Sequence, residues 1–207
     1  YQKRPYEFLE EKGVLGPWFL GAHSLLLSEE EKELIRERGV RICHCPFSNC
    51  GKAVPDTPSL LKKGIPVGLG TDGAAHGGLS IWNEMKIFRS VMNVTHGAPL
   101  AEPAVMPAKK ILDIAVKGGA ACLGEEPATI AVGKRADLIG IDMDAPHLWI
   151  HGKISNTLLE SVGAGDVKDM IVGGRFLMRN REILTLDEEK IRSEALAFEK
   201  GESRWSI

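Results

Sequence analysis

The stretch VGLGTDGAA, from Val67 to Ala75, decides the fold of this sequence. Its first four residues are small or apolar and predict a short buried strand. Thr71, Asp72 and Gly73 follow as a polar, turn-forming triplet that ends this strand. Because α/β enzymes place catalytic groups at the C-terminal tips of buried strands, Asp72 is the first candidate functional residue.

Length and composition indicate a globular protein. The 207 residues suffice to bury a core in one or two domains, and 43% hydrophobic with 26% charged residues is typical of such chains. A net charge of −2 gives no reason to expect nucleic acid or an anionic membrane as partner. No apolar run approaches the roughly 20 residues of a membrane span, and no signal peptide is visible.

The cysteines raise one alternative. Cys43, Cys45 and Cys50 lie close to His44, as in a zinc knuckle. Their spacing lacks the C-x2-C pair of structural zinc sites, and Cys43 is expected on the buried face of a strand. We therefore expect free thiols in a cytoplasmic protein.

Strand and helix patterns alternate three times in the first 75 residues. Strands are predicted over 18–22, 40–43 and 65–69, with helices over 5–12, 29–38 and 59–63. This rhythm predicts an α/β fold of parallel βα units, either a barrel or a doubly wound sheet. A dinucleotide-binding open sheet is disfavoured, because no G-x-G-x-x-G follows the first strand.

The later chain changes in character. Helices are predicted over 79–94, 108–116 and 119–123, then strands over 136–141, 161–171 and 175–178, with a hairpin turn at Gly173-Gly174 and a last helix over 188–200. This pattern divides the chain into a barrel segment (1–127), a β-rich segment (128–186) and a C-terminal helix (187–207).

Each early strand leads into a polar residue, namely His23, His44 and Asp72. Barrel strands end on one rim, so these residues can converge there. Imidazole nitrogen and carboxylate oxygen are ligands that zinc or ferrous iron accepts. Structural roles are the alternative: a hydrogen-bonded histidine at a strand end, and a turn or helix-capping role for Asp72.

Several motifs together resemble the amidohydrolase superfamily, and within it the methylthioadenosine/S-adenosylhomocysteine deaminase and chlorohydrolase branch. They are GAHSLLLSEEE from Gly21, HCPFSN from His44, GIPVGLGTDGAA from Gly64 with a downstream NEMK, TIAVGKRADLIGID from Thr129 and DVKDMIVGGR from Asp166. The resemblance covers almost the whole chain.

The resemblance implies strands 6–8 of a TIM-like (β/α)8 metal-dependent hydrolase barrel, plus part of a small flanking β-sandwich. The family's first-strand His-x-His pair does not occur in this sequence, and its fifth-strand histidine and general-acid glutamate are also missing. We therefore expect the C-terminal part, lacking strands 1–5, of an enzyme about twice this length.

The resemblance also implies roles. Asp72 matches a metal ligand that shuttles a proton, and His23 matches a histidine beside the metal and the attacking water. His44 matches a histidine near the substrate pocket. From their positions we also expect Asn49 and His76 to contact a small heterocyclic substrate, with a solvent-facing loop residue as the alternative for His76. The expected activity is hydrolysis of non-peptide C–N bonds, as in deamination of a purine nucleoside, with a divalent metal ion, zinc or else iron.

Two other readings stay open. The substrate loops depart from the branch, since His76-Gly77-Gly78 replaces the usual Ser-Asn-Asn, so chlorohydrolase-type dehalogenation of a heterocycle is one alternative. The other is a non-catalytic fragment or pseudoenzyme that folds only with a partner chain. Because three βα units leave two open sheet edges, we expect a homo-oligomer or association with the missing N-terminal half.

Overall fold

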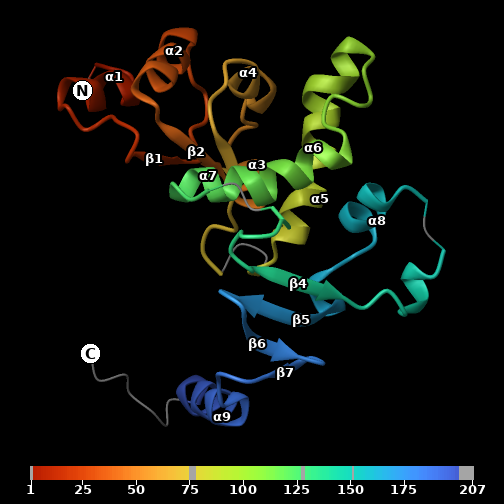
Figure 1. Ribbon diagram of the computed structural model, residues 1–207. Coiled ribbons are helices and arrows are strands. Elements are labelled where there is room, and N and C mark those ends of the chain that lie inside the picture. The colour runs from red at the N-terminus through yellow and green to blue at the C-terminus, as the bar shows by residue number, and fades with distance from the viewer. Residues whose placement is uncertain (1, 75–77, 127–128, 151, 201–207) are drawn as a thin grey trace. The chain divides into compact units, whose positions relative to one another are not determined.

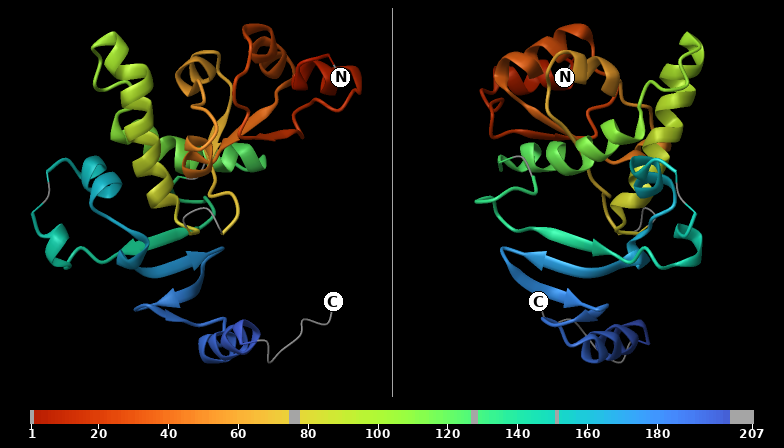
Figure 2. Two further views of the ribbon diagram at one scale, coloured as in Figure 1. Left: turned by 180° about the vertical axis from the view of Figure 1, so that it is seen from behind. Right: turned by 45° about the vertical axis from the view of Figure 1, so that its right-hand side comes forward.

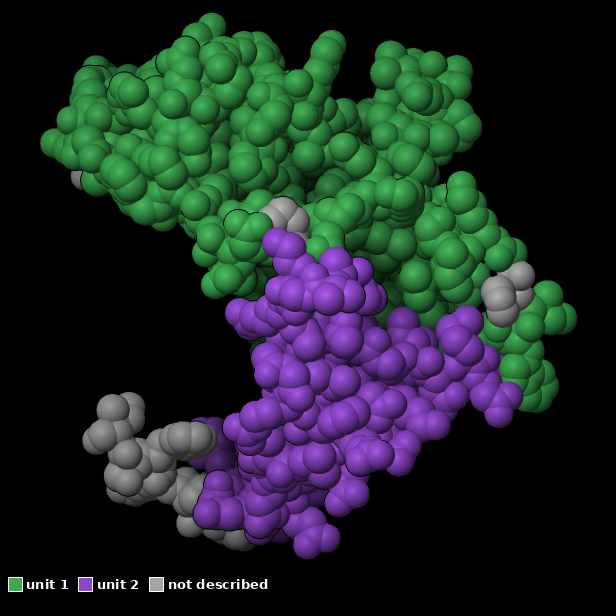
Figure 3. All heavy atoms as spheres, viewed as in Figure 1, with its two compact units in different colours: residues 1–129, 146–164 green, residues 130–145, 165–207 purple. Residues whose placement is uncertain are grey.

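The computed structural model of the protein describes residues 2–74, 78–126, 129–150 and 152–200. The chain forms two compact units (Figure 3): unit 1 comprises Tyr1–Thr129 and Pro146–Ala164, and unit 2 comprises Ile130–Ala145 and Gly165–Ile207. Each unit has its own sheet. The expected segment limits at residues 127 and 186 stay a prediction.

Unit 1 contains a three-stranded parallel sheet in the order β1-β2-β3 (Figure 1). Its strands are β1 (Leu20–Ala22), β2 (Arg41–His44) and β3 (Val67–Leu69). Leu20 lies opposite Arg41, and Ile42 lies opposite Val67. The parallel βα units predicted from the alternating pattern are confirmed.

Three helices accompany these strands on one side of the sheet (Figures 1 and 2): α1 (Pro5–Glu11), α2 (Glu29–Arg38) and α4 (Thr57–Lys62). Helix α2 begins at the capping box that the sequence predicts. Ser28 Oγ accepts a hydrogen bond from Glu31 N at 3.2 Å, and the Glu31 carboxylate accepts one from Ser28 N at 3.0 Å. It ends at Gly39, whose φ of +67° suits glycine.

The remaining helices of unit 1 follow the sheet strands or lie between them: α3 (Pro46–Cys50), α5 (Ile81–Met92), α6 (Ala108–Asp113), α7 (Gly119–Leu123) and α8 (Ile154–Glu160). Two π-helical turns, Asn93–Gly97 and Ile114–Gly118, follow α5 and α6. No helix in the described part of the chain has the length and apolar character needed to span a bilayer.

The core of unit 1 forms where these helices pack on the sheet. Ile42 and Val67 from the strands, Ile35 from α2, and Phe88 and Met92 from α5 are each at most 2% exposed. Burying one such side chain contributes roughly 1.5–3 kcal/mol, so this cluster is a main source of stability.

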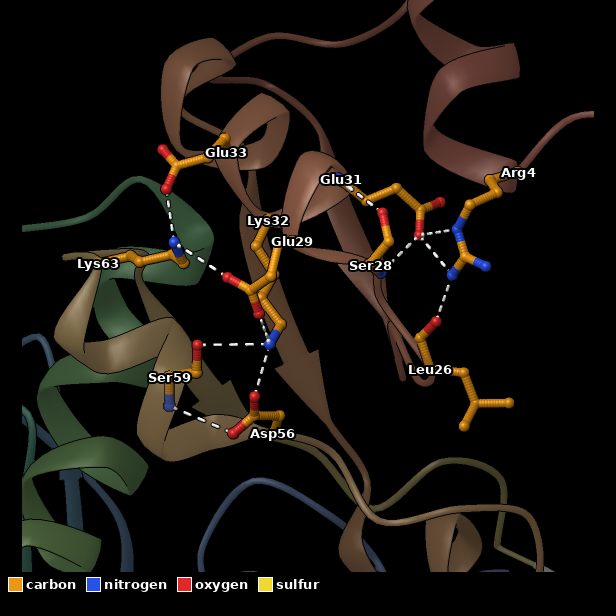
Figure 4. A network of polar contacts seen from close by, with 10 residues as sticks. All are labelled: Arg4, Leu26, Ser28, Glu29, Glu31, Lys32, Glu33, Asp56, Ser59 and Lys63. Carbon is orange, nitrogen blue, oxygen red and sulfur yellow. Dashed lines mark hydrogen bonds and ion pairs between the residues drawn. The ribbon is translucent and has the colours of Figure 1, made fainter.

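A polar network joins α2 to α4 at the edge of this core (Figure 4). The Lys32 side chain is buried, and its ammonium donates to Glu29 Oε1 at 2.7 Å, to Asp56 Oδ2 at 2.5 Å and to Ser59 Oγ at 3.3 Å. All three ammonium protons thus have acceptors, which a buried lysine requires.

Unit 2 contains a four-stranded antiparallel sheet and a helix. Its elements are β4 (Leu138–Ile141), β5 (Val167–Val172), β6 (Arg175–Arg179), β7 (Glu182–Ile183) and α9 (Glu188–Glu199). Gly173 and Gly174 connect β5 to β6 with φ of +55° and +80°. Positive φ at both positions is what a tight hairpin turn needs, so the predicted turn is confirmed.

Two local predictions were wrong. The strand expected over 161–171 begins only at Val167, because a 3-10 turn at Ala164–Asp166 interrupts the chain beside Gly163 and Gly165. The buried side chains of β2 are Ile42 and His44, and Cys43 on the opposite face is only half-buried. Cys43, Cys45, Cys50 and Cys122 are free thiols.

Candidate active site

Three candidate residues lie at the C-terminal ends of the parallel strands. His23 directly follows β1, His44 ends β2, and Asp72 comes shortly after β3. The strand pairing extends to this edge, since His23 N donates to Cys43 O at 2.8 Å and Gly70 N donates to His44 O at 2.7 Å. Parallel pairing therefore brings the three chain segments to one edge of the sheet.

His23 and Asp72 meet at this edge. His23 Nε2 lies 3.5 Å from Asp72 Oδ2, and the two side chains are 31% and 30% exposed. Solvent and ligands can therefore reach both groups. The structure brings together the two residues that the sequence nominates as metal ligands.

The backbone of both residues is in the left-handed region. The φ angles are +62° at His23 and +58° at Asp72, and φ is also positive at Ser24 and Leu26, in the segment that follows His23. Such a conformation costs a non-glycine residue about 1–2 kcal/mol. Backbone strain of this kind clusters at functional sites, where the surrounding structure over-determines it.

The short helix α3 supplies the partners of both side chains. His23 Nδ1 donates to Asn49 Oδ1 at 2.7 Å, and Ser48 Oγ donates to Asp72 Oδ2 at 2.7 Å. Lys52, just beyond the helix, donates to Ser48 Oγ at 2.7 Å. No pattern in the sequence points to Ser48 or Lys52 as such partners.

His44 is fully buried. Its Nδ1 donates to the backbone oxygen of His23 at 3.0 Å, so its ring supports the His23 backbone. Burial lowers the pKa of His44 to about 4, an effect that this hydrogen bond only partly opposes. At neutral pH the ring is therefore uncharged, and its Nε2 has no hydrogen-bond partner among the described residues.

Asn49 is buried as well, and its Nδ2 has no hydrogen-bond partner in the described part of the chain. The structure thus places His44 and Asn49, two expected substrate contacts, beside His23. His76, the third, lies outside the described residues.

Glu84, on α5, is a buried carboxylate near this site. Its Oε2 accepts a hydrogen bond from Phe47 N, in the first turn of α3, at 2.8 Å. Burial raises the pKa of Glu84, the bond from Phe47 opposes this rise, and the charge of Asp72 adds to it. Glu84 belongs to the NEMK motif, from which a packing or pairing role is expected, but the sequence does not indicate its contact with α3.

The donor atoms at this edge fit one metal ion. Zinc binds imidazole nitrogen and carboxylate oxygen at about 2.0–2.2 Å, so two ligands of a tetrahedral zinc lie about 3.4 Å apart. The observed separation of His23 Nε2 and Asp72 Oδ2 is 3.5 Å. Across the ranges that the structure describes, however, no group of three or more His, Cys, Asp or Glu side chains could hold a metal ion. His23 and Asp72 would thus account for only two of the ligands that such a site needs.

Two curated proteins are similar in sequence to this chain over most of its length. The 5'-deoxyadenosine deaminase of Methanosarcina acetivorans is 38% identical over 198 residues, which cover 94% of this chain and 45% of the relative. The 5-methylthioadenosine/S-adenosylhomocysteine deaminase of Dictyoglomus thermophilum is 37% identical, over 94% of this chain and 46% of the relative. The chain spans about half the length of these curated relatives.

Solved structures show the same fold. An adenosine deaminase from Xanthomonas campestris with bound zinc superposes with a TM-score of 0.89 at 26% identity, over 97% of this chain and 46% of its own. The atrazine chlorohydrolase of Arthrobacter aurescens, complexed with zinc, gives a TM-score of 0.81 at 25% identity, over 95% and 44%.

The sequence profile of the amidohydrolase family matches residues 2–177, which is most of the chain. The parallel sheet with polar residues at its carboxyl edge agrees with that match. The chain belongs to the amidohydrolase family.

Proposed function

We propose that this chain is part of a metal-dependent hydrolase that breaks non-peptide C–N bonds, an aminohydrolase acting on a nitrogen heterocycle such as a purine nucleoside. Family membership and relatives named as adenosine-type deaminases support this proposal. The observation that carries it is the 3.5 Å approach of His23 Nε2 to Asp72 Oδ2 at the carboxyl edge of the sheet.

In this proposal His23 and Asp72 hold a divalent metal ion, zinc in the first instance and iron as the alternative. Bound there, the ion would supply a water of lowered pKa, which is a nucleophile near neutral pH. A catalytic zinc has three protein ligands, so further ligands would come from residues other than those described.

Asp72 has a second role in the proposed reaction. Its carboxylate accepts a proton from the attacking water and passes it to the leaving nitrogen. The ring carbon gains oxygen and loses ammonia, so an amino group is replaced by a carbonyl. His23, which holds the same ion in this proposal, would place the water of that ion next to Asp72.

His44 and Asn49 are proposed to contact the substrate, together with His76. Buried donors and acceptors normally have partners, and an unpartnered atom in a native structure calls for an explanation. His44 Nε2 and Asn49 Nδ2 are two such atoms within the described residues. Both atoms are fully buried in this chain, so a heterocycle would contact them only after the side chains around them move.

Dehalogenation of a heterocycle is the second candidate. The observation that favours it is the match to atrazine chlorohydrolase, with a TM-score of 0.81. The same attack by water at a ring carbon would release chloride instead of ammonia.

Product release separates these proposals. The zinc-loaded chain is incubated with adenosine, 5'-deoxyadenosine, 5'-methylthioadenosine and atrazine, and ammonia and chloride are measured. Ammonia release that Asp72→Asn abolishes would support the aminohydrolase, and chloride release would support the second candidate. If neither the wild type nor Asp72→Asn binds zinc, and neither ammonia nor chloride is released, the result would support a non-catalytic fragment that needs a partner chain. Size-exclusion chromatography tests the proposed self-association in the same samples.

A further inference from the structure

Two adjacent residues of α3 hold the two candidate metal ligands. Asn49 is bonded to His23, and Ser48 is bonded to Asp72. Both α3 side chains are at most 5% exposed, so water does not compete with these bonds. The first turn of the helix is itself tied to α5 by the bond between Phe47 N and Glu84 Oε2.

The bond to Asn49 determines the tautomer of His23. The amide oxygen can only accept, so Nδ1 of His23 carries the proton. The other ring nitrogen, Nε2, then presents a lone pair, and it is this atom that lies 3.5 Å from Asp72. A metal ion needs this lone pair, because a protonated ring nitrogen cannot bind it.

The two hydrogen bonds that link Lys52 to Asp72 through Ser48 also have only one possible donor-to-acceptor direction. An ammonium group can only donate and an ionised carboxylate can only accept. The Lys52 ammonium therefore donates to Ser48 Oγ, and the single hydroxyl proton of Ser48 is left for Asp72 Oδ2. The other carboxylate oxygen, Oδ1, accepts Gly73 N at 2.8 Å, so the carboxylate is held at both oxygens.

We propose that Asn49, Ser48 and Lys52 are positioning residues: Asn49 selects the His23 tautomer that can bind a metal ion, and Lys52 acts through Ser48 to fix the Asp72 carboxylate. The inference rests on the proposed metal role of His23 and Asp72. Partners of metal-binding side chains commonly set ring orientation and tautomer in this way, and losing one costs about 10- to 100-fold in metal affinity.

The tautomer is measured first, without metal, by two-bond proton–nitrogen NMR of the histidine rings in the full 207-residue chain. We expect Nδ1 of His23 to be protonated in the wild type and in Asn49→Asp, whose carboxylate also accepts. In Asn49→Leu we expect the proton to shift toward Nε2. A wild-type ring protonated at Nε2, or an unchanged ring in Asn49→Leu, would overturn the assignment.

The claim that Lys52 fixes the Asp72 carboxylate through Ser48 is tested by substituting Lys52. This residue is exposed, so the substitution does not threaten folding. We expect Lys52→Met to weaken binding of Zn2+ alone about 10-fold or more, measured by competition with a coloured chelator, and Lys52→Arg to retain it. Ser48→Ala and Ser48→Thr form the second pair, in which threonine restores the hydroxyl. Equal Zn2+ affinity in all four variants and the wild type would overturn the proposed role of Lys52 and Ser48.

A metal-independent measurement keeps the inference separate from the proposed function. Hydrogen exchange at Gly73 N reports whether the Asp72 carboxylate is held, and we expect it to accelerate in Lys52→Met and Ser48→Ala but not in their conservative partners. If the wild type binds no zinc, the proposed function fails, while the His23 tautomer and the Gly73 exchange still decide this inference.

Discussion

The two sheets of this chain bury their residues in different ways. Every residue of β3 is buried, whereas half-buried and exposed residues alternate along β5 from Val167 to Val172. Among the described residues, all the buried apolar side chains belong to unit 1. Strands buried on both faces are typical of parallel sheets, and alternation is typical of antiparallel sheets with a solvated face.

The two sheets also differ in where their left-handed residues lie. The backbone strain at His23 and Asp72 has to be compensated by the surrounding structure. In the parallel sheet, His44 and Leu69 pair at the carboxyl edge and both are buried, so this edge is packed. In the antiparallel sheet, positive φ occurs in the turns, at Gly173 and Gly174 and at the exposed residues Asn180 and Arg181 between β6 and β7.

Truncating a core side chain gives the largest expected contrast between the units. Phe88, on α5, is 1% exposed, and Phe88→Ala should lower the free energy of unfolding by about 3–5 kcal/mol. Phe176, on β6, is 41% exposed, so Phe176→Ala should cost about 1 kcal/mol or less. Urea unfolding followed by circular dichroism measures both. Equal costs would refute the view that unit 1 alone has a tightly packed core.

Close backbone packing gives the second contrast. A Cβ at Gly118 would overlap the carbonyl oxygen of Val67 in β3, so Gly118→Ala should cost about 1–3 kcal/mol. The neighbouring Gly119 has no atom within 4 Å of such a Cβ, and Gly119→Ala should be neutral or stabilising by up to about 1 kcal/mol. In unit 2, Gly140→Ala would approach only the Asp169 side chain and should be mild. Thermal melting of the three variants ranks them, and a tolerated Gly118→Ala would contradict this packing.

Helix N-caps give a third comparison of the two units, because each unit has a cap in which a side chain accepts a hydrogen bond from the backbone three residues later. Ser28 accepts from Glu31 N and Asp187 accepts from Lys190 N. Ser28→Ala should lower the global free energy of unfolding by about 1 kcal/mol, because α2 buries Ile35 in the core. Helix α9 has no buried residue, so Asp187→Ala should fray α9 alone. Amide hydrogen exchange distinguishes local from global loss; global destabilisation by Asp187→Ala would contradict the division.

The smallest expected effect is pH-dependent. Burial raises the pKa of Asp56, but the hydrogen bond and charge of Lys32 outweigh this and leave it below its ordinary value. The stabilisation is therefore full above about pH 4 and is lost as the pH falls through the lowered folded-state pKa. Asp56→Asn, which keeps a capping side chain, should cost about 1 kcal/mol at pH 7, because Asp56 is 42% exposed and water screens the pair. Unfolding curves from pH 7 to pH 2 should show this difference closing; a gap that persists at pH 2 would refute the role of the charge.

Much of the fold follows from local patterns. The capping box at Ser28, the glycine at position 39 and the alternation of short apolar runs with polar helices are signals within a few residues, and each predicted its element. The sequence did not predict helix α8, and it placed the start of the following strand too early, at Ser161 instead of Val167. Helix α8 starts after Lys153 without a capping side chain, so no local start signal marks it, and Gly163 and Gly165 break the strand.

The site was predictable in part. Parallel pairing made the meeting of His23 and Asp72 foreseeable, because strand ends share an edge. Ser48 and Lys52 were not foreseeable, since their contacts depend on α3, a helix of five residues inside a segment that reads as a loop. The pairing of Glu84 with Phe47 joins residues far apart in the chain, and no local pattern encodes it.

The left-handed backbone at the sheet edge affects how mutations there should be interpreted. Alanine at position 72 removes the carboxylate and keeps an unfavourable φ of +58°, whereas glycine removes the carboxylate and adopts that φ readily. Asparagine tolerates the same region and removes only the charge. A series of Asn, Gly and Ala at this position therefore separates a chemical contribution from a conformational one, which an alanine scan would merge into a single number.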